Sequence, residues 1–231
     1  MSTFSPMPAV RDMSWPVSGT HYVCLVSMEA TARNVPGFAK QIGLLVLGLD
    51  PYLKLVVLLP EDVDVGNLGA SLGAMAERCD MVQGSGVEIL GGVFSHRLDP
   101  SSSNEGTSSK AIVVATGQPR QIPRVVDGVD RTLRSLGVTE IMYPLGDNRI
   151  RVLKTATGSD AKMALREIVK GPGLTICVDG DIDAMDLRQV IWGTATRFQP
   201  ADDIVLQSGG MGIDGTKPQG WKAKTATIPF D

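Results

Sequence analysis

The sequence predicts an α/β protein with two similar units in tandem, each a parallel or mixed sheet with flanking helices. Residues 55–80 align without a gap on residues 174–199 after a shift of 119 positions. Six aligned positions are identical, whereas composition alone would give about one or two. Both stretches also contain an apolar run, an acidic turn and an amphipathic helix in the same order. This order is typical of a sheet covered by helices.

The central strand and helix of each unit follow from local patterns. The aliphatic runs LKLVVLL (residues 53–59) and LTICV (174–178) have the length of a buried strand. Asn67 and Asp186 occupy equivalent positions and offer a side-chain oxygen to the free N–H groups of a first helical turn. The apolar positions of the two helices lie on one face at helical spacing: Leu68, Leu72, Met75, Ala76 and Cys79, and then Leu187, Val190, Ile191, Thr194, Ala195 and Phe198.

Each unit has a further strand and helix upstream. The predicted strands are residues 21–28 and 149–155, and the predicted helices are residues 36–49 and 160–169. Pro36 suits the first position of its helix, and Ser159 or Asp160 can cap the other.

The remaining segments complete the predicted organisation. A helix over residues 123–136 connects the units and ends at Gly137. Its apolar face is predicted to contain Val126, Val129, Leu133 and Leu136. Residues 1–19 and 217–231 are predicted to be irregular arms, and residues 100–109 a polar surface loop. The predicted domains are therefore residues 1–119 and 120–231.

Composition indicates an ordinary globular protein. The 231 residues are 43% hydrophobic and 5% aromatic with a net charge of −3, which gives no general attraction to nucleic acid or to an anionic membrane. No apolar run approaches the roughly 20 residues needed to span a bilayer, and the first ten residues lack the apolar core of a secretory signal. Three scattered cysteines favour reduced thiols over disulfides. We expect a cytoplasmic protein.

Several motifs resemble the C-terminal region of UbiD-family decarboxylases, which typically contains a DxDID turn, a WAxATR helix and a final GIDATKP. In the second unit these are GVTEIMYP (137–144), VDGDIDAMDLRQVIWGTATRFQPADDIV (178–205) and MGIDGTKP (211–218). In the first unit they are VPGFAKQ (35–41), LKLVVLLPEDVDV (53–65) and LDPSS (98–102). The two units differ from the family in complementary ways. When the two units are compared, Gly73 stands at the position of Trp192 and Val114 stands at the position of Asp214. Only the first unit has the LDPSS loop.

The resemblance implies a fold and a role but no catalytic residue. In the family, chemistry takes place on a prenylated flavin held by a separate domain with a glutamate–arginine–glutamate network and a divalent metal. The C-terminal domain mainly mediates oligomerisation and closes over the active site. Because both units resemble only that C-terminal domain, we expect neither a flavin cofactor nor a bound metal in this chain.

The acidic turns are the most suggestive candidate site. Their main carboxylates are Asp62 and Asp64 in the first unit and Asp181 and Asp183 in the second. Alternating carboxylates at the ends of strands can bind Mg²⁺ or Ca²⁺. They can also cap the following helices, and this interpretation is favoured because the EF-hand spacing is missing.

Three further side chains are candidates for contact with a ligand. Arg78 and Arg197 end equivalent helices and can hold a substrate carboxylate or form ion pairs with the aspartates of the turns. We favour the ion pairs. Trp192 can line a pocket, although its position in an amphipathic helix favours the core. Only two histidines, His21 and His96, occur, which disfavours a site with several histidine ligands.

Two functions are consistent with these patterns. The first is a non-catalytic scaffold or subunit of a decarboxylase or carboxylase assembly, which associates with itself or with a UbiD-type decarboxylase subunit. The second is a flavin-independent, carboxy-lyase-like enzyme. It would act on a carboxylated, aromatic or polyketide-like ligand in the cleft between the two units.

Overall fold

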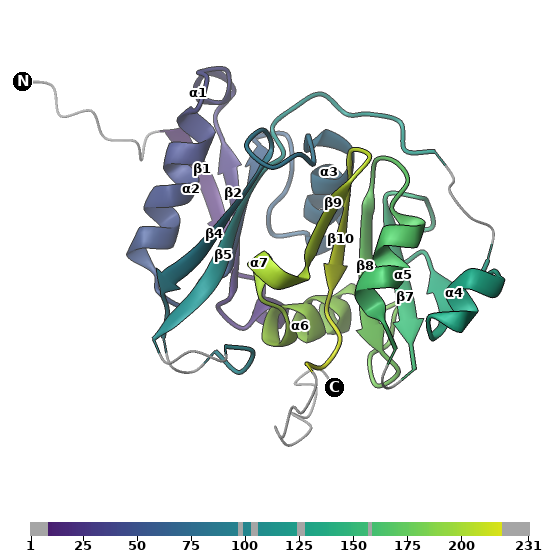
Figure 1. Ribbon diagram of the computed structural model, residues 1–231. Helices are drawn as coiled ribbons and strands as arrows, with labels where there is room; N and C mark the ends of the chain where they lie inside the picture. The colour runs from purple at the N-terminus through teal and green to yellow at the C-terminus, as the bar shows by residue number, and fades with distance from the viewer. Residues whose placement is uncertain (1–8, 97–98, 103–105, 124–127, 157–158, 219–231) are drawn as a thin grey trace, which may run out of the picture.

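The computed structural model describes residues 9–96, 99–102, 106–123, 128–156 and 159–218. It confirms the predicted α/β class, with two five-stranded mixed sheets and flanking helices (Figure 1). The first sheet, in the order β1-β2-β3-β5-β4, contains β1 Val10–Ser14, β2 Val23–Met28, β3 Leu55–Pro60, β4 Val87–Phe94 and β5 Thr107–Val114. The second, in the order β6-β7-β8-β10-β9, contains β6 Val138–Met142, β7 Ile150–Thr155, β8 Leu174–Asp179, β9 Ile204–Gln207 and β10 Gly210–Asp214.

The helices connect these strands and cover the sheets. They are α1 Ala30–Arg33, α2 Phe38–Leu49, α3 Leu68–Arg78, α4 Arg131–Ser135, α5 Ala161–Ile168, α6 Leu187–Arg197 and α7 Pro200–Asp203, with a 3₁₀ helix, η2, at Val17–Gly19. Across the described ranges, no helix is both long enough and apolar enough to cross a membrane.

The two sheets have the same pattern of strand pairing. In each sheet the three inner strands run parallel, and both edge strands run antiparallel to their neighbours. Strands β3 and β8 begin at Leu55 and Leu174, and helices α3 and α6 begin at Leu68 and Leu187. Both pairs of starting points are 119 residues apart, the same shift that aligns the sequences.

The layers of the molecule follow from the alternation of side chains along each strand. The inner faces of both sheets pack with α3 and α6 into one apolar cluster. The outer face of the first sheet packs against α2, and the outer face of the second packs against α5. The layers are therefore α2, first sheet, α3 with α6, second sheet and α5 (Figure 1). Apolar side chains of both sheets therefore fill the space around α3 and α6.

The predicted role of Pro36 is wrong. Helix α2 begins at Phe38, and its N-cap is Gly37 with a φ of 77°. Glycine adopts this left-handed conformation at no steric cost, so the chain turns into the helix after the proline rather than at it. At α5, by contrast, Asp160 caps the helix as predicted, and its side chain accepts a hydrogen bond from the Met163 N–H.

The predicted helix over residues 123–136 is too long. Of the described residues in this range, only those of α4, Arg131–Ser135, are helical, because Asp130 accepts a hydrogen bond from the Leu133 N–H at 2.8 Å and caps the helix there. Residues 124–127, which include Val126, lie outside the described residues. Gly137 follows the helix with a φ of 88°, in agreement with the predicted stop.

Two segments that were predicted to be irregular contain strands. Strand β1 lies within the predicted arm of residues 1–19, and β5 begins within the predicted loop of residues 100–109. Pairing with β2 and with β3 and β4 satisfies the backbone of these segments despite their polar residues. The predicted C-terminal arm falls mainly on residues 219–231, outside the described residues.

The three cysteines are free and buried, as predicted. Burial raises the pKa of Cys24 and of Cys79 to about 12 and raises the pKa of Cys177 well above its ordinary value. Because the thiolate is the reactive form, we expect Ellman's reagent to label none of them in the native protein at pH 8. All three should react once the protein is denatured. Rapid, stoichiometric labelling of any native cysteine would contradict this prediction.

Candidate functional site

The acidic turn of the second half forms a compact ion-pair cluster around Arg197. This side chain is only 3% exposed. Its Nη1 donates to Asp179 Oδ2 at 3.0 Å, and its Nη2 donates to Asp181 Oδ2 at 2.9 Å. Burial acts to raise the pKa of Asp181, but hydrogen bonds from Arg197 and Lys217 outweigh it and hold that pKa below its ordinary value. The guanidinium also lies 5.6 Å from the ring of Trp192, which is buried in the central core.

The equivalent arginine of the first half has a more exposed partner. Arg78 Nη2 donates to Asp62 Oδ2 at 2.8 Å, and the Asp62 side chain is 56% exposed. Both arginines therefore form the ion pairs that we favoured from the sequence. Water screens the Arg78 pair far more than the Arg197 pair, so the two are expected to differ in strength.

The other two predicted aspartates hold the turns. Asp64 Oδ1 accepts a hydrogen bond from the Gly66 N–H at 2.8 Å, and Asp183 Oδ1 accepts one from the Met185 N–H at 2.9 Å. The nearby residues Asn67 and Asp186 cap α3 and α6. In the part of the chain that the structure describes, no three His, Cys, Asp or Glu side chains group closely enough to hold a metal ion.

The structure reveals a second polar centre, around Lys54, that the sequence analysis missed. The Lys54 side chain is fully buried, and its Nζ donates to Asp99 Oδ1 at 3.0 Å, to Ser101 Oγ at 2.9 Å and to the Phe198 carbonyl oxygen at 3.1 Å. The ammonium lies 4.5 Å from the centre of the Tyr22 ring. Burial lowers the pKa of Lys54 to about 8, although the neighbouring Asp99 carboxylate acts in the opposite direction.

Gln199 extends this centre across the molecule. Its Nε2 donates to Asp99 Oδ2 at 2.8 Å and to Ser101 Oγ at 2.9 Å. Its Oε1 accepts from the N–H and the hydroxyl of Ser109 at 3.0 and 3.2 Å. The residues that follow α6 are thereby joined to the LDPSS loop and to β5, about a hundred positions earlier in the chain.

Two other buried cations lie outside this network. Lys110 Nζ donates to the carbonyl oxygens of Pro51 and Leu53, and burial lowers its pKa. Arg151 donates from Nε to Thr175 Oγ1 at 3.1 Å, but its two terminal nitrogens have no hydrogen-bond acceptor among the described residues. Burial also lowers the pKa of Arg151.

A sequence signal for the Lys54 centre did exist. Lys54 lies within the apolar run LKLVVLL, and a charged residue in a buried strand is rarely found without a partner. Asp99 in the LDPSS loop is a carboxylate that could serve as this partner. Their meeting could not be predicted, because the Lys54 contacts with Asp99 and Phe198 span 45 and 144 positions of the chain.

A family model described as the 3-octaprenyl-4-hydroxybenzoate carboxy-lyase C-terminal domain (UbiD_C) matches residues 2–115 and 149–226. The chain belongs to this UbiD C-terminal-domain family. A curated relative, a phenolic acid decarboxylase of Escherichia coli O157:H7, is 33% identical over 100 residues, which are 40% of this chain and 20% of the relative. The chain thus matches about a fifth of the length of that relative.

Solved structures of UbiD-class enzymes are also similar to parts of the chain. The enzyme HmfF of Pelotomaculum thermopropionicum, in complex with FMN, is 25% identical with a TM-score of 0.43, over 55% of this chain and 28% of HmfF. The closed form of the vanillic acid decarboxylase of Sedimentibacter hydroxybenzoicus is 26% identical with a TM-score of 0.42, over 56% of this chain and 28% of that enzyme chain.

In this UbiD C-terminal-domain protein, three motifs of the second half meet at Arg197. The DGDID turn supplies Asp179 and Asp181, and α6 supplies the arginine. The GIDGTKP segment supplies Lys217, whose Nζ lies 2.8 Å from Asp181 Oδ2 and whose N–H donates to Asp179 Oδ2 at 2.7 Å. Arg197 and Lys217 are therefore paired inside the chain with the carboxylates of the DGDID turn.

Proposed function

We propose that this UbiD C-terminal-domain protein is a non-catalytic scaffold or subunit of a UbiD-type decarboxylase or carboxylase assembly. The observation that supports this most directly is the shared core, in which the two sheets bury their inner faces against each other around α3 and α6. Inner faces that are buried against each other in this way are suited to a structural role and not to binding a substrate. The polar centres at Arg197 and Lys54 support the same proposal, because their partners come from the chain itself.

We further propose that the chain is an internal repeat, with units at residues 1–119 and 120–231. The identical strand order of the two sheets and the 119-residue spacing of their central strands and helices support this division. In such an arrangement the apolar interface between the two units of one chain replaces an interface between two separate domains. Contact of a carboxylated ligand with the acidic turns, Arg78, Arg197 or Trp192 stays a prediction of the alternative enzyme.

The proposal predicts a protein without bound flavin. We expect the chain to stay colourless after co-expression with a flavin prenyltransferase. Both proposed units resemble only the C-terminal domain, and in the family a separate domain holds the flavin. An intact UbiD-class decarboxylase expressed in the same strain is the control and should acquire a flavin absorbance band. A stoichiometric flavin band on the present chain would contradict the proposal.

The assembly itself can be tested by mixing the purified chain with an intact UbiD-class decarboxylase. Light scattering after gel filtration should show a complex heavier than either protein, and decarboxylation should require the enzyme. If the chain formed no complex and decarboxylated an aromatic acid by itself, the alternative enzyme would replace the scaffold.

A further inference from the structure

The carboxyl end of the outer helix α2 concentrates negative charge. No residue from Gln41 to Leu49 is charged, and Asp50 follows as the C-cap. The carbonyl oxygens at the end of a helix are partly negative themselves, so this position favours a cation. On α5, the outer helix of the second half, Arg166 lies in the last turn and Lys170 follows the helix. The end of α2 therefore lacks the cation that the end of α5 has.

Within the described ranges, no cationic side chain forms an ion pair with Asp50. Its Oδ1 accepts a hydrogen bond from the Tyr52 N–H at 2.9 Å. Lys110 is close enough to be attracted by the carboxylate, but its Nζ donates to the carbonyl oxygens of Pro51 and Leu53 instead. The half-buried Asp50 thus remains available to a cation from outside the chain.

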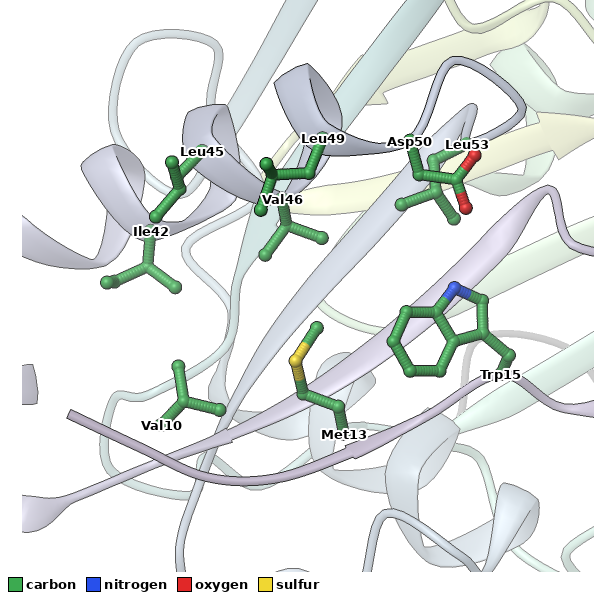
Figure 2. A pocket seen from close by; sticks show the side chains of 9 residues that line it. All are labelled: Val10, Met13, Trp15, Ile42, Leu45, Val46, Leu49, Asp50 and Leu53. Atoms are coloured by element: carbon green, nitrogen blue, oxygen red, sulfur yellow. The ribbon is translucent and has the colours of Figure 1, made fainter. Parts of the chain in front are cut away.

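An apolar hollow of about 280 Å³ lies next to this carboxylate, between β1 and α2. Met13 and Trp15 line it from the β1 side, and Leu45 and Leu49 line it from α2, with Asp50 following Leu49 along the helix side (Figure 2). Asp50 is the one charged residue that lines it. Leu49 is 70% exposed and Trp15 is 41% exposed, so the hollow can be reached from solvent. It is suited to an apolar chain.

A second cavity, of about 600 Å³, also includes Asp50 in its wall. Tyr22 and Tyr52 line it together with the carboxylate. The Tyr52 ring stacks on the ring of His96 with 4.4 Å between their centres, which fixes its orientation. Aromatic faces attract organic cations. Asp50 therefore lies where an apolar hollow and an aromatic cavity meet.

Two further features of the second cavity indicate a ligand. Thr20 and His21 line it and adopt consecutive left-handed conformations, with φ of 48° and 65°. Such conformations are uncommon outside glycine and cluster at ligand sites. The Thr20 hydroxyl is also buried without a hydrogen-bond partner in the part of the chain that the structure describes. Neither feature depends on the charge of Asp50, and both lie in the same wall.

We propose that Asp50 binds a small amphipathic ammonium ion, in which a primary ammonium group is joined to an apolar chain. The ammonium pairs with the Asp50 carboxylate at the end of α2, beside the tyrosines. The chain lies in the hollow between β1 and α2. Small-molecule pockets commonly measure about 300–1,000 Å³, and the two cavities are of this order. This site does not depend on the proposed scaffold function.

Other ligand classes fit these groups less well. An anion would be repelled by Asp50 and by the end of α2. A neutral apolar molecule would shield the carboxylate from water without replacing its hydrogen bonds, which is costly. A metal ion needs several ligands, and no three His, Cys, Asp or Glu side chains group together among the residues described. A primary ammonium has three donors, which complement the carboxylate and the Thr20 hydroxyl.

Isothermal titration calorimetry of the full chain with hexylammonium chloride, at constant ionic strength, tests this proposal. One molecule should bind per chain. Hexan-1-ol should bind at least about tenfold more weakly, because it cannot form the ion pair, and hexanoate should not bind. From propylammonium to hexylammonium, each added CH₂ group should strengthen binding about fourfold, because the chain enters the apolar hollow.

Asp50→Asn separates the ion pair from the shape of the site. The amide keeps an oxygen for the Tyr52 N–H, so circular dichroism should show folded protein. Affinity for hexylammonium should fall at least about tenfold, while affinity for hexan-1-ol should not fall. Asp12→Asn is the matched control. Asp12 is exposed on β1, accepts a hydrogen bond from the Met13 N–H, and lines neither cavity. Its removal changes the net charge equally and should leave the affinity unchanged.

Three results would each overturn the proposal. The first is a wild type that does not bind hexylammonium, and the second is equal affinity for hexylammonium and hexan-1-ol. The third is equal weakening by Asp50→Asn and Asp12→Asn, which would show general attraction to a negative protein. Leu49→Ser should reduce the gain per CH₂ group without abolishing the preference for the ammonium. An unchanged gain would contradict the placement of the chain in the hollow.

Discussion

Lys54→Ala is expected to lower the free energy of unfolding by about 3–5 kcal/mol, because it leaves the fully buried Asp99 carboxylate without its cation. Chemical denaturation at pH 7 measures this loss. Asp99→Ala should produce a loss of similar size, and the double variant should lose much less than the sum, since the two side chains act as one pair. Lys40→Ala is the matched control. Its ion pair with Glu88 is partly exposed, so the loss should be about 1 kcal/mol or less.

The same lysine predicts a particular pH dependence. Its pKa is lowered from 10.5 to about 8 in the folded protein. Between these values the unfolded chain still holds the proton that the native protein has released, so the contribution of Lys54 to stability rises with pH. Relative to Lys54→Met, the wild type should therefore gain stability from about pH 8 upward. A constant difference between the two proteins across this window would contradict the lowered pKa.

Arg197→Ala is expected to have the second-largest effect, a loss of about 3 kcal/mol or more in the free energy of unfolding. The guanidinium is 3% exposed and holds Asp179 and Asp181 together, so its removal leaves these neighbouring carboxylates with the partly exposed Lys217, which pairs with Asp181, as their remaining cation among the described contacts. Asp181→Ala should also destabilise the protein, and the two losses should not be additive. Arg78→Ala is the matched control from the equivalent helix. Because Asp62 is mostly exposed, we expect a loss of about 1 kcal/mol or less.

The Arg197 cluster should also weaken in acid. The pKa of Asp181 lies below its ordinary value in the folded protein, so its contribution is complete above the unfolded pKa and is lost as the pH falls through the folded value. The difference in the free energy of unfolding between the wild type and Asp181→Asn should therefore decrease as the pH falls through the folded pKa of Asp181.

These variants also discriminate between the two functional classes. A structural ion pair predicts that Arg197→Ala shifts the melting curve. If the melting curve stayed in place while binding of a carboxylated ligand or an activity was lost, the alternative enzyme would be favoured over the scaffold. Melting curves with and without an aromatic carboxylic acid make this comparison directly.

Local patterns in the sequence were enough to place the central strand–turn–helix of each half. Strands begin at the apolar runs of Leu55 and Leu174, and the helices that follow are capped by Asn67 and Asp186. These features depend on neighbours within a few positions, so they can be predicted without knowledge of the tertiary structure. The ion pairs of the two arginines could be proposed for the same reason, because each arginine lies 16 positions after its aspartate in equivalent turns.

Only the tertiary structure decided the rest. Strand β1 exists because β2 offers it a pairing edge, a condition that the residues of β1 do not encode by themselves. The Lys54 centre exists because the chain returns Phe198 and Gln199 to the LDPSS loop, and a buried lysine is tolerable only where such distant acceptors converge. The uncharged surface of α2 could be read from the sequence as an apolar helix, but not as an exposed one. Which face of a helix remains uncovered depends on every other element that could have packed against it.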